Sequence, residues 1–161
     1  IPNEGEYFTI SVTVPIYMQF VVLPSSQLAF GSFYSPDYTI KNNGSKTLVA
    51  KMNSFYMDVS EETKNSTLLY IEEVVGGDGK TQMELGMRAI ENLDSNGDAK
   101  EIDLTKIDTL SDEDKILYEL NANEARKVKF VSEKWELPKY ESKKDTAFSS
   151  YIAGFEFSIK E

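Results

Sequence analysis

The sequence predicts an all-β protein: an antiparallel β-sandwich or jelly roll with one or two short helical segments. Apolar residues recur at every second position in most stretches, which is the period of a strand with one buried face. Turn residues punctuate the chain about every ten positions, as in sandwiches built from many short strands. At 161 residues the chain is long enough for one such unit with its own core, so we expect a single domain over 1–161.

The stretch Tyr7–Leu23 carries the clearest strand pattern in the chain. Apolar residues alternate with small polar ones up to Pro15, and a second apolar alternation follows it. Proline cannot donate a ladder hydrogen bond, so we expect two strands, with the pairing broken or moved to another sheet at Pro15. The residues that share one expected face are Phe8, Ile10, Val12 and Val14 before the proline, and Ile16, Met18, Phe20 and Val22 after it.

Two more predicted strands flank the turn Asn42–Ser45. Tyr38–Lys41 and Thr47–Met57 both have strand character. The Asn-Gly pair between them adopts positive φ at little cost, which predicts a hairpin. The alternation of the second strand slips at Asn53, which predicts a β-bulge there. The residues expected on one face of that strand are Leu48, Ala50 and Met52.

Five further stretches have strand character, and three of them carry a continuous apolar row. We expect these rows to face the core, because alternate side chains of a strand lie on one face of its sheet. The stretches are Leu28–Phe33, Leu68–Val75, Gln82–Ile90, Arg126–Trp135 and Phe148–Ile159. The rows are Met83, Leu85, Met87 and Ala89 in the third stretch, Val128 and Phe130 in the fourth, and Tyr151, Ala153, Phe155, Phe157 and Ile159 in the last.

The stretch Asp112–Leu120 fits two structures. Ser111 followed by Asp114 is typical of a helix N-cap with acidic residues in the first turn, which predicts a short helix. Lys115–Leu120 fits equally well as a strand before a turn at Asn121–Asn123. Short apolar runs do not distinguish the two, so both interpretations stay open.

Composition excludes several classes of function. The chain has 27 acidic and 17 basic residues and a net charge of −10, whereas nucleic acids need a basic surface, so we expect no nucleic-acid partner. It contains no cysteine and no histidine, which rules out thiolate zinc sites, thiol catalysis and a Ser-His-Asp triad. We therefore expect no enzyme and no catalytic residues. No apolar run is long enough to span a bilayer, so we expect no membrane insertion.

The best candidate for a metal site is the loop Asp94–Asp98. Asp94, Asn96 and Asp98 place oxygen ligands at alternate positions in a loop that contains glycine, which suits calcium. The loop departs from the EF-hand pattern, because Ala99 and Thr105 stand where that pattern has its glycine and its bidentate glutamate. The alternative is an ordinary Asp-Asn-Gly turn, and we expect no other cofactor.

Aromatic residues are concentrated in the first half of the chain. Exposed rings would form a stacking platform for a sugar. We favour the competing interpretation, core packing and cross-strand pairs, because aromatic side chains dominate protein cores. The residues are Tyr7, Tyr17, Tyr34, Tyr38, Tyr56, Tyr70, Phe30, Phe33 and Phe55.

Three short motifs resemble exported surface proteins of Gram-positive bacteria. The stretch 38–52, YTIKNNGSKTLVAKM, resembles the strand, Asn-Asn-Gly-Ser, strand unit of TasA/camelysin-like matrix proteins. The stretch 11–22, SVTVPIYMQFVV, resembles WxL-type wall-associated domains, and Trp135-Glu136-Leu137 is a Trp-x-Leu triplet. The resemblance implies a secreted jelly roll that assembles into extracellular fibres, in which an N-terminal segment of one subunit completes the sheet of the next.

These observations together predict a non-enzymatic structural protein at the cell surface that assembles with copies of itself. Long edge strands carry unpaired backbone groups that can pair with another chain. We expect residues 1–14 to act as the donor strand between subunits. The side chains expected to pair or insert are Ile1, Tyr7, Phe8, Ile10, Val12 and Val14. The alternative is a monomeric surface module that binds cell-wall polysaccharide.

Overall fold

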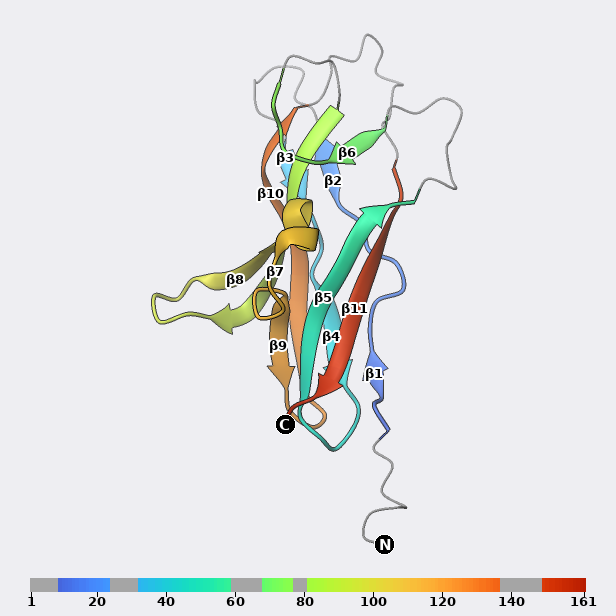
Figure 1. Cartoon of the computed structure of the whole chain (residues 1–161), viewed down its shortest axis with the longest axis vertical. Helices are drawn as coiled ribbons and strands as arrows, with labels where there is room; N and C mark the ends of the chain where they lie inside the picture. Colours follow the sequence, from blue (N-terminus) through green and yellow to red (C-terminus); the bar gives the residue numbers. More distant parts are fainter. Residues whose placement is uncertain (1–8, 24–31, 59–67, 77–80, 137–148) are drawn as a thin grey trace, which may run out of the picture.

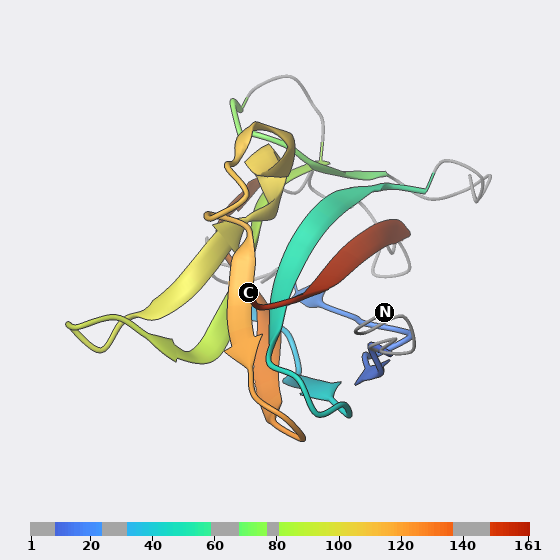
Figure 2. The same cartoon turned by 60° about the horizontal axis from the view of Figure 1, so that its bottom comes forward.

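Two layers of strands face each other across one apolar core, as the sequence predicts (Figures 1 and 2). The computed structural model describes residues 9–23, 32–58, 68–76, 81–136 and 149–161. The larger sheet contains, in spatial order, β1 (Val12–Thr13), β4 (Tyr38–Asn42), β10 (Ala125–Glu136), β7 (Thr81–Leu93) and β6 (Leu69–Ile71), with β8 (Ala99–Asp103) also paired to β7. The smaller sheet contains β11 (Tyr151–Ile159), β5 (Leu48–Met57) and β9 (Ile116–Leu120), and β2 (Val21–Leu23) pairs with β3 (Ser32–Tyr34) in a separate ribbon.

The strand β7 forms the centre of the larger sheet. Its first half lies between β10 and β6, and β6 is its one parallel neighbour among the described strands. Its second half pairs with β8, and the β7–β8 hairpin projects from the body of the sandwich as an arm (Figure 1). The predicted row of Met83, Leu85, Met87 and Ala89 is confirmed, since all four side chains are almost completely buried.

The core lies between this row and the inner face of β5. Leu48, Ala50 and Met52 of β5 are buried, as are Val128 and Phe130 of β10, so both predicted rows are confirmed. The predicted bulge in β5 is also confirmed: the register passes from Ser54 to Met52 opposite successive residues of β11 and leaves Asn53 without a partner. Gly154 lies opposite the bulge, where a Cβ atom would collide with the Ser54 side chain.

The predicted hairpin at Asn42–Ser45 is wrong. β4 belongs to the larger sheet and β5 to the smaller one, so this loop crosses between the layers. Neither Asn43 nor Gly44 has the positive φ that a two-residue hairpin turn requires. The loop is held instead by the buried side chain of Asn42, whose Oδ1 accepts from the Gly44 N–H at 2.9 Å and whose Nδ2 donates to the Lys46 carbonyl at 2.7 Å.

The stretch after β8 contains a helix that the sequence pattern does not indicate. The 3₁₀-helix η2 (Leu104–Thr109) begins at Asp103, whose carboxylate accepts from the Thr105 N–H, and it buries Leu104 and Ile107 against the core. The cap expected at Ser111 does form, since its hydroxyl accepts from the Asp114 N–H, but it closes only a turn. The chain then enters β9, so the strand interpretation of this stretch is right and the helix is wrong.

The stretch around Pro15 forms two short strands in different sheets. β1 has two residues and β2 has three, and the segment between them has no regular structure. The predicted change of sheet at Pro15 is therefore confirmed, whereas the predicted strand lengths are wrong. Met18, Phe20 and Val22 pack against the core as expected, but the side chain of Ile16 is 87% exposed.

Candidate functional site

On one side of the sandwich, each sheet ends in an edge strand that has a described neighbour on one side only (Figure 1). One terminal strand of the smaller sheet is β11, which has nine residues and pairs with β5 alone among the described strands. The last strand of the larger sheet is β1, which pairs with β4 over two residues. Edge strands of this kind present free backbone N–H and C=O groups.

The register shows which backbone groups of β11 point away from β5. Asp58 N–H donates to the Ser150 carbonyl at 2.8 Å, and Lys160 N–H donates to the Thr47 carbonyl at 2.9 Å. Residues along an antiparallel strand alternate between bonding the neighbour and facing away from it. The even-numbered residues of β11 therefore bond β5. The residues whose backbone groups point along the free edge are Tyr151, Ala153, Phe155, Phe157 and Ile159.

The side chains of these same five residues are the predicted inward row, and they are only half-buried. In a central strand they would be covered from both sides, so the partial burial follows from the position of β11 at the edge. The free edge of β11 thus combines unpaired backbone groups with apolar side chains that a further strand would help to cover.

The residues expected to mediate self-association lie on or near β1. Val12 and Val14 are half-buried in the chain's own sandwich, and Val12 lies opposite Asn42 of β4. Ile10 precedes β1, and its side chain is 41% exposed. Ile1, Tyr7 and Phe8 lie outside the described residues.

Few contacts attach β1 to β4. Besides the two ladder positions, Asn43 N–H donates to the Ser11 carbonyl at 2.8 Å and Asn43 Nδ2 donates to Thr13 Oγ1 at 2.8 Å. All of these contacts lie at one end of β4. This strand therefore depends on a short set of bonds, unlike the long ladder between β11 and β5.

The segment from Val14 to Phe20 connects β1 to β2, and the Tyr38 side chain bonds its backbone. The hydroxyl of Tyr38 donates to the Gln19 carbonyl at 3.1 Å and accepts from the Gln19 N–H. Ile16 and Tyr17 stand out at the surface, 87% and 86% exposed. The sequence pattern predicts neither the bonds from the Tyr38 hydroxyl to Gln19, here called the clamp, nor the exposure of Ile16. The apolar alternation continues across Pro15, so Ile16 is expected on the same face as Met18.

An aromatic cluster anchors the end of this segment. Phe20 stacks on Phe33 of β3 and on Tyr151 of β11, with ring centroids 5.7 and 6.2 Å apart, and meets the ring of Phe130 edge-on. Burial raises the pKa of Tyr151 to about 12, and its hydroxyl donates to the Leu69 carbonyl. Core packing is thus confirmed for part of the predicted aromatic set. The set also has exposed members, namely Tyr17, Tyr34 and Tyr56.

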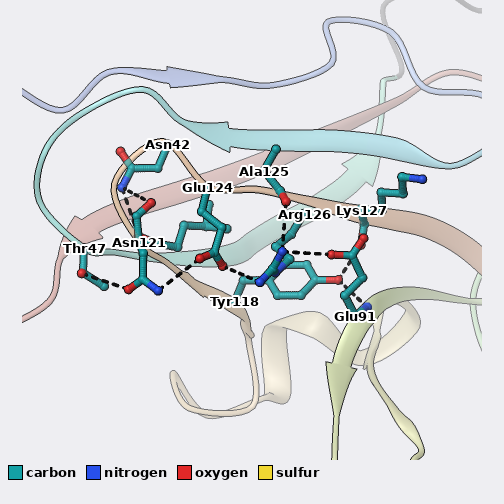
Figure 3. A network of polar contacts seen from close by, with 10 residues as sticks. Asn42, Thr47, Glu91, Tyr118, Asn121, Glu124, Ala125, Arg126 and Lys127 are labelled. Carbon is teal, nitrogen blue, oxygen red and sulfur yellow. Dashed lines mark hydrogen bonds and ion pairs between the residues drawn. The ribbon is translucent and has the colours of Figure 1, made fainter.

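A network of polar contacts closes the end of the sandwich where β4 leads into β5 and β9 leads into β10 (Figure 3). Asn42 Nδ2 donates to the Leu120 carbonyl at 3.0 Å and to the Asn121 carbonyl at 3.2 Å, which joins the β4–β5 loop to the β9–β10 turn. From there the contacts continue through side chains to β7. In order they are Thr47 to Asn121, Asn121 to Glu124, Glu124 to Arg126, and Arg126 to Glu91.

Tyr118 adds a buried contact to the same network. Its hydroxyl accepts from the Glu91 N–H at 2.8 Å and donates to the Lys127 carbonyl at 2.6 Å, so it spans from the smaller sheet to β7 and β10 of the larger one. Burial raises the pKa of Tyr118, against the opposing effect of the Glu91 N–H. Side chains therefore join the two sheets in this part of the molecule, where β9 forms the other edge of the smaller sheet.

The predicted calcium loop forms the tip of the β7–β8 arm. Asp94 Oδ1 accepts from the N–H groups of Asn96 and Asp98 at 2.8 and 3.0 Å, and Gly97 has a φ of +85°. Within the described ranges, no three acidic side chains are close enough to hold a metal ion together. Calcium binding by Asp94, Asn96 and Asp98 stays a prediction, and an unchanged melting temperature with and without a chelator would contradict it.

The fold and its edges define a class, an all-β sandwich with two open edge strands on one side. In the part of the chain that is described, no helix combines the length and apolarity needed to cross a bilayer. Comparisons with protein-family models, with curated proteins and with solved structures found no match to this chain. The function is therefore argued from the geometry of the edges.

Proposed function

We propose that the protein is an exported structural subunit that builds an extracellular fibre or matrix by β-strand addition between copies. The observation that carries the proposal is the outer edge of β11, a strand of nine residues that has one neighbour, β5, among the strands the structure describes. An added strand would bond the free backbone groups and bury more of the half-exposed apolar row. Backbone hydrogen bonds supply the affinity in this mode of recognition, and alternate side chains supply the specificity.

The donor strand is the N-terminal stretch 1–14. β1 has only two ladder residues in its own sandwich, so few hydrogen bonds to β4 must break for β1 to detach. Val12 and Val14 then insert into a neighbouring subunit, together with Ile10, which is already exposed. Ile1, Tyr7 and Phe8 extend the same pattern toward the N-terminus.

The net charge of −10 opposes association between copies. Like charges repel less when salt screens them, so assembly through this edge should be promoted by raised ionic strength. An ionic association between acidic and basic patches would show the opposite salt dependence. The direction of the salt effect therefore separates strand addition from a charge-driven contact.

The direct test compares the full chain with a variant that lacks residues 1–14, by electron microscopy and by light scattering over a range of concentrations. The full chain is expected to form filaments, and the truncated chain is expected to remain a folded monomer. A full chain that stays monomeric at high concentration would overturn the proposal.

The second candidate is a monomeric module that binds cell-wall polysaccharide. The exposed rings of Tyr17, Tyr34 and Tyr56 favour it, since sugars stack on aromatic faces. Retention of the soluble monomer on purified cell wall, with loss of retention on replacing these tyrosines by alanine, would support this candidate against self-assembly.

A further inference from the structure

The chain contains two Asn-Gly pairs, Asn43-Gly44 and Asn96-Gly97, and the structure places them in different surroundings. In such a pair the backbone nitrogen of the glycine can attack the side-chain carbonyl carbon of the asparagine. The new N–C bond closes a succinimide ring, the bond from Cγ to Nδ2 breaks, and ammonia leaves with the proton of the glycine N–H. Water then opens the ring to aspartate or to its β-linked isomer, isoaspartate. Glycine favours the reaction because it has no Cβ atom to obstruct the approach.

Asn96-Gly97 lies at the exposed tip of the β7–β8 arm (Figure 1). The Asn96 side chain forms no hydrogen bond with the described residues, so its carbonyl carbon is accessible. A Cβ atom added at Gly97 would meet no other atom within 4 Å, so the ring has room to form. The reactive groups make one bond in the part of the chain that is described, from the Gly97 N–H to the Asp94 carbonyl at 3.0 Å.

Asn43-Gly44 lies in the β4–β5 loop, where both reactive groups are bonded. Asn43 Nδ2 donates to Thr13 Oγ1 at 2.8 Å, and the Gly44 N–H donates to Asn42 Oδ1 at 2.9 Å. The Asn42 side chain is completely buried. Gly44 is also crowded, because an added Cβ atom would lie 3.4 Å from Asn42 Oδ1 and 3.7 Å from the Thr9 carbonyl oxygen. Ring closure here must break one more hydrogen bond than at the arm tip and displace a loop that a buried side chain holds.

We propose that Asn96 is a site of spontaneous deamidation and that the fold protects Asn43 from the same reaction. Leu93 pairs with Ala99 in the β7–β8 ladder, so the change at Asn96 lies within the turn and leaves the sheets intact. Protection of Asn43 preserves the attachment of β1, because a carboxylate at this position would have no N–H to donate to Thr13. The proposal does not depend on the assembly of copies.

The test follows both sites in the full chain during incubation at mildly alkaline pH, below the temperature of unfolding. Peptide mapping with tandem mass spectrometry measures the mass increase that accompanies replacement of the side-chain NH₂ by OH. Asn96 is expected to react at least about fivefold faster than Asn43, the factor that one net hydrogen bond contributes. In urea, where only the local sequence remains, the two rates are expected to converge. Equal rates in the folded chain, no conversion of Asn96, or a difference that persists in urea would overturn the proposal.

Two variants assign the effect to the two sites. Thr13→Val keeps the β-branched shape at an exposed position but removes the acceptor of the Asn43 Nδ2 bond, so it should speed conversion of Asn43 about fivefold and leave Asn96 unchanged. Asn96→Gln lengthens the side chain, which disfavours ring closure, and should abolish the product at the arm tip without changing the rate at Asn43. An unchanged rate at Asn43 in Thr13→Val would overturn the protection by this bond.

Discussion

Two regions of this sandwich connect the same two sheets in different ways. At the closed end, the β4–β5 loop and the β9–β10 turn both cross between the layers, and buried side chains join them. At the open side, β1 and β11 end their sheets without a further partner among the described strands. At the closed end, the side chain of Asn42 bonds backbone carbonyls of the β9–β10 turn, whereas at the open side β1 and β11 have backbone groups that no described strand bonds. The two regions meet at Asn42 and Asn43, which attach β1 to the end of β4.

The largest effect is expected from Asn42→Ala at the closed end. Asn42 is completely buried, and its loss leaves the carbonyls of Leu120 and Lys46 and the N–H of Gly44 without their partner. Buried groups left unsatisfied cost about 1–3 kcal/mol each, so we expect about 3 kcal/mol or more of lost unfolding free energy in urea. Asn43→Ala is the control, because its exposed side chain bonds Thr13 alone among the described residues, and it should cost less than about 1 kcal/mol.

Two proline substitutions in β11 test whether its two backbone edges differ. The backbone of Glu156 faces Lys51 of β5, so Glu156→Pro should remove a ladder bond and cost about 3 kcal/mol. The backbone of Ala153 faces the free edge, so Ala153→Pro should cost less than about 1 kcal/mol and stop association. Urea unfolding measures the first effect and light scattering the second. Assembly of Ala153→Pro at the wild-type rate would show that copies do not pair along β11.

The aromatic cluster around Tyr151 should make stability depend on alkaline pH. The pKa of Tyr151 is about 12 in the folded chain and near 10 when unfolded, so folding favours its neutral form. This contribution is complete below pH 10 and is lost as the pH rises through 12, by about 2 kcal/mol. Unfolding free energies measured from about pH 9 to pH 12 should fall less steeply for Tyr151→Phe than for the wild type. Parallel curves would show that this hydroxyl does not titrate differently on folding.

The sequence predicts the strands better than the connections between them. The rows in β5, β7 and β10 follow from a period of two residues, which is local information. The hairpin at Asn42–Ser45 is wrong because its deciding contacts, with Leu120 and Asn121, lie almost eighty positions along the chain. An Asn-Gly pair has the same composition in a hairpin and in a loop that crosses between sheets.

The candidate site divides in the same way. The alternation of apolar and polar residues predicts that edge strands exist, and it predicts every residue of the inward row of β11. Whether β11 lies at the edge of its sheet depends on the order of the strands, which a single sequence does not contain. The clamp on Gln19 by the Tyr38 hydroxyl also arises from contacts between distant segments.

The smallest effect on stability is expected from Tyr38→Phe, which tests whether release of β1 limits assembly. Its hydroxyl bonds both backbone groups of Gln19 at a partly exposed position, so its loss should cost less than about 1 kcal/mol. It should nevertheless release the segment that joins β1 to the core, which would speed hydrogen exchange at Gln19 and speed assembly. Tyr34→Phe is the matched control, since that exposed hydroxyl has no hydrogen bond to the described residues. Faster exchange without faster assembly would mean that release of β1 does not limit association, and unchanged exchange would mean that the Tyr38 hydroxyl does not restrain the segment.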